Sequence, residues 1–223
     1  MRLRYVYPAL LVVGLCSLRP AHAQTSFDLN IGFGSAWDGS NGQGIEGANS
    51  AYAFESCAPG APIDTYCQST PSLSGFFLGL GGDLMLTKRY GVGAEVSFEP
   101  GRQNYGPLQY RQTFYDFNGI YAPINQKRVI LEIQGGIGGS RTSFAINESS
   151  CVGIVACSSE TVPFANSNHF QVHVGVGLQL FVSGHFFVRP QFDYHYVPNY
   201  GQVFNSNSVP AAMVWVGYSF GDR

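Results

Sequence analysis

The 223-residue sequence predicts an all-β fold, an eight-stranded antiparallel up-and-down transmembrane β-barrel with short periplasmic turns and long extracellular loops. Three observations support this prediction: apolar and polar residues alternate along eight segments, the links between segments alternate in length, and the chain begins with an export leader. Two-residue periodicity indicates strands with two different faces. Most of the segments approach the roughly 9 to 11 residues of a tilted strand that crosses a bilayer.

The first 23 residues have the features of a cleaved signal peptide. Arg2 and Arg4 form a basic start, residues 9–18 are apolar, and Ala21-His22-Ala23 has the small–any–small pattern of a cleavage site. The mature barrel domain is therefore expected to comprise residues 24–223. Loss of three leader arginines changes its formal charge from −2 to −5, from 9 basic and 14 acidic residues. This balance argues against a nucleic-acid-binding protein, which needs a basic face.

The eight alternating segments are residues 27–33, 76–86, 92–99, 113–121, 129–138, 170–180, 186–196 and 212–220. The clearest is 170–180, where Phe170, Val172 and Val174 alternate with Gln171 and His173. Tight links are predicted near residues 88–89, 123–127 and 183–184. Long links are predicted at 38–72, 100–108, 142–168 and 198–207, as expected when extracellular loops are free to grow.

The composition of the two faces distinguishes a membrane barrel from a soluble ligand-carrying barrel. The polar face is mostly Gly, Gln and Asn, and charged residues make up only 12% of the chain, whereas a soluble barrel wall needs many charges. Glycine suits the cramped interior of an eight-stranded barrel. Aromatic residues gather near the segment ends, as in interfacial girdles: Phe27, Trp37, Tyr121, Tyr194, Tyr196, Tyr218 and Phe220.

The leader, the eight segments and the closing strand at 214–220 resemble the OmpA-like and OmpW-like small outer-membrane β-barrel superfamily. The resemblance implies location in the bacterial outer membrane, contact with its lipid and lipopolysaccharide, and recognition by the outer-membrane assembly machinery. The aromatic–any–aromatic ending Tyr218-Ser219-Phe220 is similar to the signal that this machinery recognises. The sequence departs from that pattern by continuing with Gly221, Asp222 and Arg223.

Charged residues on the polar face predict a network inside the barrel. Asp83, Glu95, Glu132 and Arg189 each lie about four to five residues from a short turn, which puts them at a similar height. A buried charge must be paired or solvated. We therefore expect Arg189 to bridge two of the acids, with water meeting the rest. Asp193 has the same parity and is expected to join this lumen network.

Four cysteines follow the leader: Cys57, Cys67, Cys151 and Cys157. An even number in an exported chain suggests two disulfides. Of the three possible connectivities, the favoured one joins Cys57 to Cys67 and Cys151 to Cys157, each within a long link. No metal site is predicted, because there is no Cys-x-x-Cys pair and no histidine at ligand spacing.

Arg111 and Arg141 share the parity of the lipid-facing residues but lie beyond the apolar belt, near the outer end. Cations in this position could contact lipopolysaccharide phosphates.

The sequence does not predict an enzyme or a cofactor. The segment around His195 resembles the His-any-Ser-Asn element of lipid A deacylases only in its histidine, because Val197 replaces the serine. Gly135-Gly136-Ile137-Gly138-Gly139 is not followed by the lysine of a phosphate-binding loop. The leading hypothesis is a structural, envelope-integrity or surface-interaction role through the extracellular loops. The alternatives are a narrow, porin-like channel for small or apolar solutes and, less favoured, a lipid A-modifying enzyme.

Overall fold

The computed structural model describes residues 26–40, 44–46, 67–69, 71–105, 108–152 and 156–221. The expected signal peptide and Cys57 lie outside these residues. Among the residues described, no helix is long and apolar enough to span a membrane.

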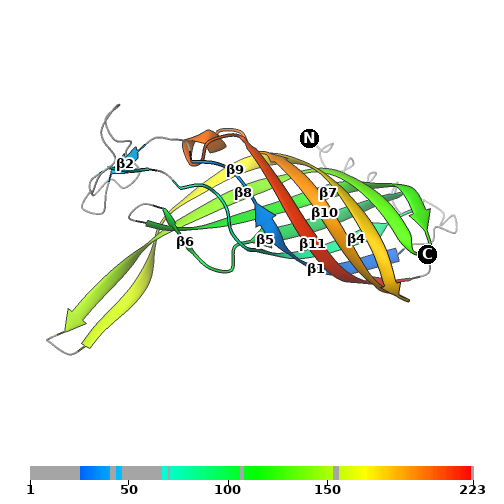
Figure 1. Ribbon diagram of the computed structural model, residues 1–223, viewed down its shortest axis with the longest axis horizontal. Helices are drawn as coiled ribbons and strands as arrows, with labels where there is room; N and C mark the ends of the chain where they lie inside the picture. The colour runs from blue at the N-terminus through cyan, green and yellow to red at the C-terminus, as the bar shows by residue number, and fades with distance from the viewer. Residues whose placement is uncertain are drawn as a thin grey trace, which may run out of the picture.

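The predicted eight-stranded antiparallel barrel is confirmed (Figure 1). Its strands are β1 (Ser26–Ala36), β4 (Phe77–Met85), β5 (Tyr90–Phe98), β7 (Leu108–Gln126), β8 (Val129–Val152), β9 (Ala156–Ser183), β10 (Phe186–Tyr196) and β11 (Ser208–Phe220). Each pairs with its neighbours in the chain, and pairing of β1 with β11 closes the ring, with Phe27 opposite Phe220. Outside the ring, β6 (Gln103–Tyr105) pairs with β7, β2 (Gly44–Glu46) pairs with β3 (Cys67–Ser69), and η1 (Tyr200–Gln202) is a short 3-10 helix.

The wall has the two faces that the alternation predicts. Along β1, Leu29 and Ile31 are exposed while Asp28 and Asn30 are buried. The same pattern along β9 exposes Val172 and Val174 and buries His173. The outward surface is therefore a belt of apolar side chains, which is stable only against the hydrocarbon of a membrane. A transmembrane barrel of this kind belongs in a bacterial outer membrane.

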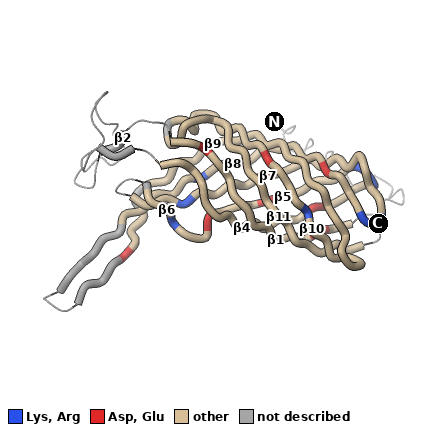
Figure 2. The backbone as a smooth tube through the Cα atoms, viewed as in Figure 1, with Lys and Arg blue, Asp and Glu red and all other residues tan. Residues whose placement is uncertain are grey.

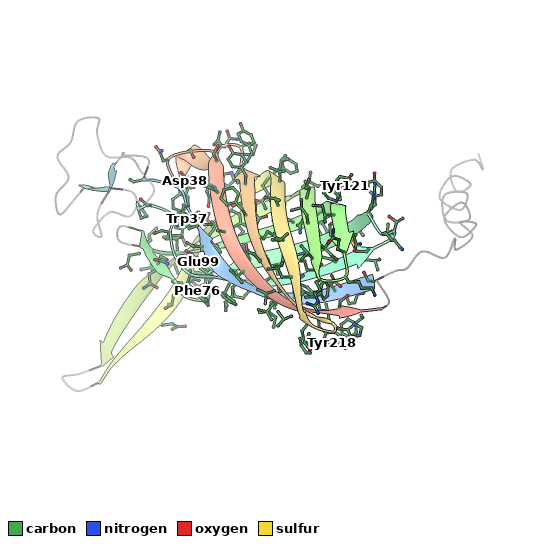
Figure 3. All side chains as sticks on the ribbon, turned by 45° about the vertical axis from the view of Figure 1, so that its right-hand side comes forward. Trp37, Asp38, Phe76, Glu99, Tyr121 and Tyr218 are labelled. Atoms are coloured by element: carbon green, nitrogen blue, oxygen red, sulfur yellow. The ribbon has the colours of Figure 1, made fainter. Side chains whose placement is uncertain are left out.

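Aromatic side chains mark both ends of the apolar belt (Figure 3). Trp37 and Phe76 lie toward the end with the long links, and Tyr121 and Tyr218 lie toward the end with the tight turns. All four are at least partly exposed. Their amphipathic rings suit the two interfacial layers of a bilayer.

Two glycines make room for the largest side chain in the lumen. A Cβ atom at Gly32 would lie 2.6 Å from the Trp215 ring, and one at Gly79 would lie 2.5 Å from it. Real Cβ atoms do not approach other atoms so closely, so these positions accept no side chain unless Trp215 shifts. Glycine on the polar face of the strands thus relieves crowding in a narrow barrel.

Two of the predicted links between strands have the wrong boundaries. The strand β7 continues through Pro123 to Gln126, with a register shift between Tyr121 and Ile124, so the following turn contains only residues 127–128. The expected loop at 142–168 is mostly strand, because β8 continues to Val152 and β9 begins at Ala156. These extensions form a hairpin that projects beyond the barrel (Figure 1). Outside the bilayer neither face of a strand must be apolar, so the alternation that marks the other strands is lost.

Candidate functional site: the filled lumen

An arginine at the centre of the barrel contacts three carboxylates. Arg189 on β10 is fully buried, and its Nη1 lies 2.8 Å from Asp83 Oδ2 and 3.0 Å from Glu132 Oε2. Its Nη2 lies 2.7 Å from Glu95 Oε1. The sequence predicts only two partners for Arg189, whereas the structure brings all three acids to the guanidinium.

These contacts span the barrel because of the strand order. Counted around the ring, β5, which carries Glu95, is four strands from β10 in either direction and therefore faces it across the lumen. Asp83 on β4 and Glu132 on β8 lie on opposite sides of β10 along the ring. A planar guanidinium with five donors can satisfy several carboxylates at once. Arg189 thus ties four strands together through the lumen.

Neutral amides complete this central cluster. Asn30 Nδ2 donates to Asp83 Oδ2 at 3.1 Å, and Gln191 Nε2 donates to Glu95 Oε2 at 3.0 Å. Gln191 Nε2 is also 2.9 Å from Asp193 Oδ1. Asp193 therefore joins the network through Gln191 and not by direct contact with Arg189. Buried polar groups need such partners, since an unpaired one is costly in a region of low dielectric constant.

A histidine layer continues the network toward the outer end of the barrel. His173 Nε2 lies 2.9 Å from Asp193 Oδ1, and the His173 ring stacks on the His195 ring at a centroid distance of 4.8 Å. His195 Nδ1 lies 3.8 Å from Asp116 Oδ2. The other carboxylate oxygen of Asp116, Oδ1, accepts a 2.7 Å hydrogen bond from Gln171 Nε2. Both histidines have the parity of the lumen face of their strands, but this layer is not among the contacts expected from the sequence. The lumen parity of Asp116 was the signal for it.

An apolar cluster fills the lumen on the extracellular side of the histidines. It contains, among others, Trp215, Met213, Phe77, Phe114, Tyr110, Tyr200 and Phe204, all of them buried. Trp215 joins it to the central cluster, since the Arg189 guanidinium carbon lies 5.6 Å from the centroid of the Trp215 ring. Phe114 stacks on His195 at 4.9 Å. Central cluster, histidine layer and apolar cluster together occupy most of the length of the lumen.

The outer rim carries the two arginines predicted to meet lipopolysaccharide. Arg141 is exposed, and its Nη2 donates to Asn166 Oδ1 at 3.1 Å. Arg111 is half-buried, and its Nε has no hydrogen-bond partner. Strands β7 and β8 place the two near each other, because Arg141 pairs with Thr113 and Arg111 pairs with Ser143.

A buried carboxyl group, Glu99, lies beside Arg111 just beyond the end of β5. Glu99 Oε2 accepts a 2.9 Å hydrogen bond from the Gln112 backbone N–H. Burial raises the pKa of Glu99 to about 7, against the opposing effects of this hydrogen bond and of Arg111. The rim therefore combines an exposed cation, a half-buried cation and a carboxyl group that titrates near neutral pH.

The predicted disulfides fall on residues whose side chains the structure does not describe. Only the backbone bears on one of them. The register of the hairpin places Cys151 opposite Cys157. Both disulfides stay predictions.

The part of the chain that the structure describes contains no group of three or more His, Cys, Asp or Glu side chains able to hold a metal ion. His195 is buried beneath Phe114 rather than facing lipid. Val197, which occupies the serine position of the deacylase element, is also fully buried. Position 197 therefore supplies no nucleophile to His195.

Neither a protein-family model nor a curated protein matches the chain, but solved structures do. Neisserial surface protein A gives a TM-score of 0.50 at 12% identity, covering 88% of this chain and 99% of that one. The outer membrane protein OprG from Pseudomonas aeruginosa gives 0.47 at 14% identity, covering 90% and 98%. Ail, the attachment invasion locus protein of Yersinia pestis, gives 0.45 at 14% identity, covering 87% and 99%. Identities this low bear on the fold alone: this chain has the barrel fold of Neisserial surface protein A.

Proposed function

We propose that the protein is a non-enzymatic, non-conducting outer-membrane barrel that supports envelope integrity and surface contacts through its extracellular end. The observation that carries this proposal is the filled lumen. Arg189 and Trp215 are 0% and 1% exposed at the centre of the barrel. An ion crossing the barrel would have to displace the three carboxylates from Arg189, which costs several kcal/mol, on the order of 3–5.

The β8–β9 hairpin is the proposed contact element. Pairing of β9 with β10 reaches only Val172, and pairing of β8 with β7 reaches only Ala145, whereas β8 and β9 pair with each other as far as Val152 and Ala156. The hairpin therefore extends past the barrel ladders on both of its edges. Strand edges of this kind can add an extended segment of a partner through backbone hydrogen bonds. A rigid barrel beneath it lowers the entropic cost of presenting such an edge.

Planar-bilayer recording of the refolded protein tests the closed lumen. We expect no stepwise conductance, because side chains block the path over most of its length. Folding is verified by different migration on a gel before and after boiling. A stable open-channel current from folded protein would overturn the proposal and favour the porin-like alternative.

One observation favours the alternative of a narrow route for small apolar solutes. A groove of about 450 Å³ lies on the outer wall, lined by Val176, Gly177, Pro190, Phe192 and Met213 among others. Pro190 has no backbone N–H, and the β9–β10 ladder skips Arg189 and Pro190 beside it. Met213 belongs to the apolar cluster, so the groove reaches residues of the lumen. Arg189 and its acids fill the space behind it, so the closed barrel is the preferred function.

Lipopolysaccharide is the proposed partner of Arg111 and Arg141. Both lie on the outer halves of adjacent strands, where a phosphate could meet one exposed and one half-buried guanidinium. The R111Q/R141Q variant is expected to retain less lipopolysaccharide after detergent purification than wild type. R128Q, which removes a cation from the turn at the opposite end, is the control. If both variants and the wild type retain equal amounts of lipopolysaccharide, this proposal is contradicted.

A further inference from the structure

The periplasmic mouth of the barrel holds a cavity of about 840 Å³. Its rim comes from three tight turns: residues 86–89 after β4, 127–128 after β7 and 184–185 after β9. Lys88, Arg89, Lys127 and His185 from these turns all line the cavity. Residues distant in the sequence thus bring three permanent cations and a histidine to one opening.

The described residues of the three turns carry only positive charge. Cationic residues gather at this end of the barrel (Figure 2), and the described residues of the three turns include no Asp or Glu. The acid that lines the cavity is Glu132, on its inner side, and its carboxylate lies 3.0 Å from Arg189 Nη1. Glu132 therefore faces inward to Arg189, whose single positive charge it shares with Asp83 and Glu95. Within the described part of the chain, the rim cations form no ion pair with a carboxylate.

The first of the turns is held in place by hydrogen bonds. Thr87 Oγ1 accepts from the backbone N–H groups of Arg89 and Tyr90 at 3.2 and 3.0 Å. Asn125 Nδ2 on β7 donates to the Lys88 carbonyl at 2.7 Å, and the Ala122 N–H donates to the Arg89 carbonyl at 2.8 Å. The backbone beneath the two cations is therefore fixed before any ligand arrives, which lowers the entropic cost of binding.

The remaining lining indicates the kind of ligand. Ser26, Thr87 and Ser219 supply hydroxyl groups, and Met85, Ile130 and Phe181 supply an apolar inner wall. Clustered Lys and Arg with nearby hydroxyl donors match the oxygens of a phosphate. An apolar wall behind them suits the organic part of the same molecule.

We propose that the periplasmic mouth binds a phosphate-bearing anion, with Lys88, Arg89 and Lys127 contacting the phosphate at the rim. Two sources share this chemistry: the headgroup of a phospholipid in the facing leaflet, and a free phosphate compound in the periplasm. The site is separate from the extracellular end to which surface contacts and lipopolysaccharide are assigned. Its test therefore stands or falls independently of the proposed function.

The test is an NMR titration of the refolded, isotope-labelled barrel in lauryldimethylamine oxide micelles, which contain no phosphate, with inorganic pyrophosphate as the probe. We expect saturable shifts at residues 86–90, 126–128 and 184–185, separate from any shifts around Arg111 and Arg141 at the extracellular rim. K88Q/R89Q/K127Q should weaken binding about tenfold or more, since it removes three charge-assisted contacts. The control R102Q/R111Q/R141Q removes three cations from the other end and should leave the pyrophosphate shifts at these turns unchanged.

A second arm distinguishes the sources. The titration is repeated in phosphatidylcholine nanodiscs with and without phosphatidylglycerol. Loss of the pyrophosphate shifts only with phosphatidylglycerol identifies the lipid headgroup, and unchanged shifts identify the free phosphate compound. The proposal is overturned if pyrophosphate gives no saturable shifts at the turns, or if the periplasmic and extracellular triple variants bind it equally well.

Discussion

Arg189→Met is expected to lower the free energy of unfolding of the barrel by about 3–5 kcal/mol, as removal of one partner from a buried ion pair generally does. Methionine approximates the length of the arginine stem but leaves the carboxylates of Asp83, Glu95 and Glu132 without their cation, 2.7–3.0 Å from where its nitrogens were. Each acid is at least 92% buried, so water cannot fully replace the guanidinium. Urea unfolding of the refolded protein, followed by gel migration, measures the change.

Two further variants separate loss of charge from loss of packing. Arg189→Lys keeps the positive charge but not the planar fork, so we expect an intermediate loss of stability. Adding D83N, E95Q and E132Q to R189M removes the uncompensated charges and should restore part of the stability. If R189M unfolds at the wild-type urea concentration, the three contacts do not stabilise the barrel.

Most of the fold follows from residue patterns that a bilayer imposes. A strand between hydrocarbon and a narrow lumen must alternate apolar and polar residues. Segments such as 170–180 can therefore be recognised as strands, and their lipid and lumen faces can be assigned. Tight turns on one side and long links on the other then determine the topology. The strand ends could not be predicted in this way, because beyond the bilayer that constraint disappears. For this reason the outer halves of β8 and β9 were expected to be loop.

The interior is only partly predictable. Parity places Asp83, Glu95, Glu132 and Arg189 in the lumen, and their distance from the turns gives a common height. It does not give the partners of each residue, which depend on how far the strands are staggered around the ring. Asp193 illustrates this: it has the expected parity, yet it lies 2.9 Å from His173 and reaches the central cluster only through Gln191.

The apolar cluster in the outer lumen was missed for a different reason. Phe114 and Tyr110 are buried on the lumen face of β7, next to the partly exposed Tyr115 on its outer face. When both faces of a strand are aromatic, the two-residue period vanishes and parity no longer separates lumen from lipid. On β11, the buried Trp215 lies between the exposed Val216 and the half-buried Val214. Apolar residues therefore stand on both faces of this strand too, and the two-residue period is lost.

The central claim is that apolar side chains face lipid while the polar network and Trp215 face inward. The chain contains two tryptophans, Trp37 and Trp215, so W37F leaves the interior one as the only fluorophore. W37F/W215F/V216W moves this fluorophore by one residue, to a position where valine is 45% exposed on the outer wall. Successive residues of a strand point to opposite faces, so the move crosses the barrel wall.

Tryptophan quenching by brominated acyl chains in liposomes measures contact with lipid directly. Both variants are refolded into liposomes of brominated phosphatidylcholine and compared with liposomes of the unbrominated lipid. We expect Trp215 to keep most of its emission and the tryptophan at position 216 to lose most of it. Strong quenching of Trp215 together with a protected tryptophan at 216 would mean that the faces are reversed, and the membrane barrel described above would be wrong.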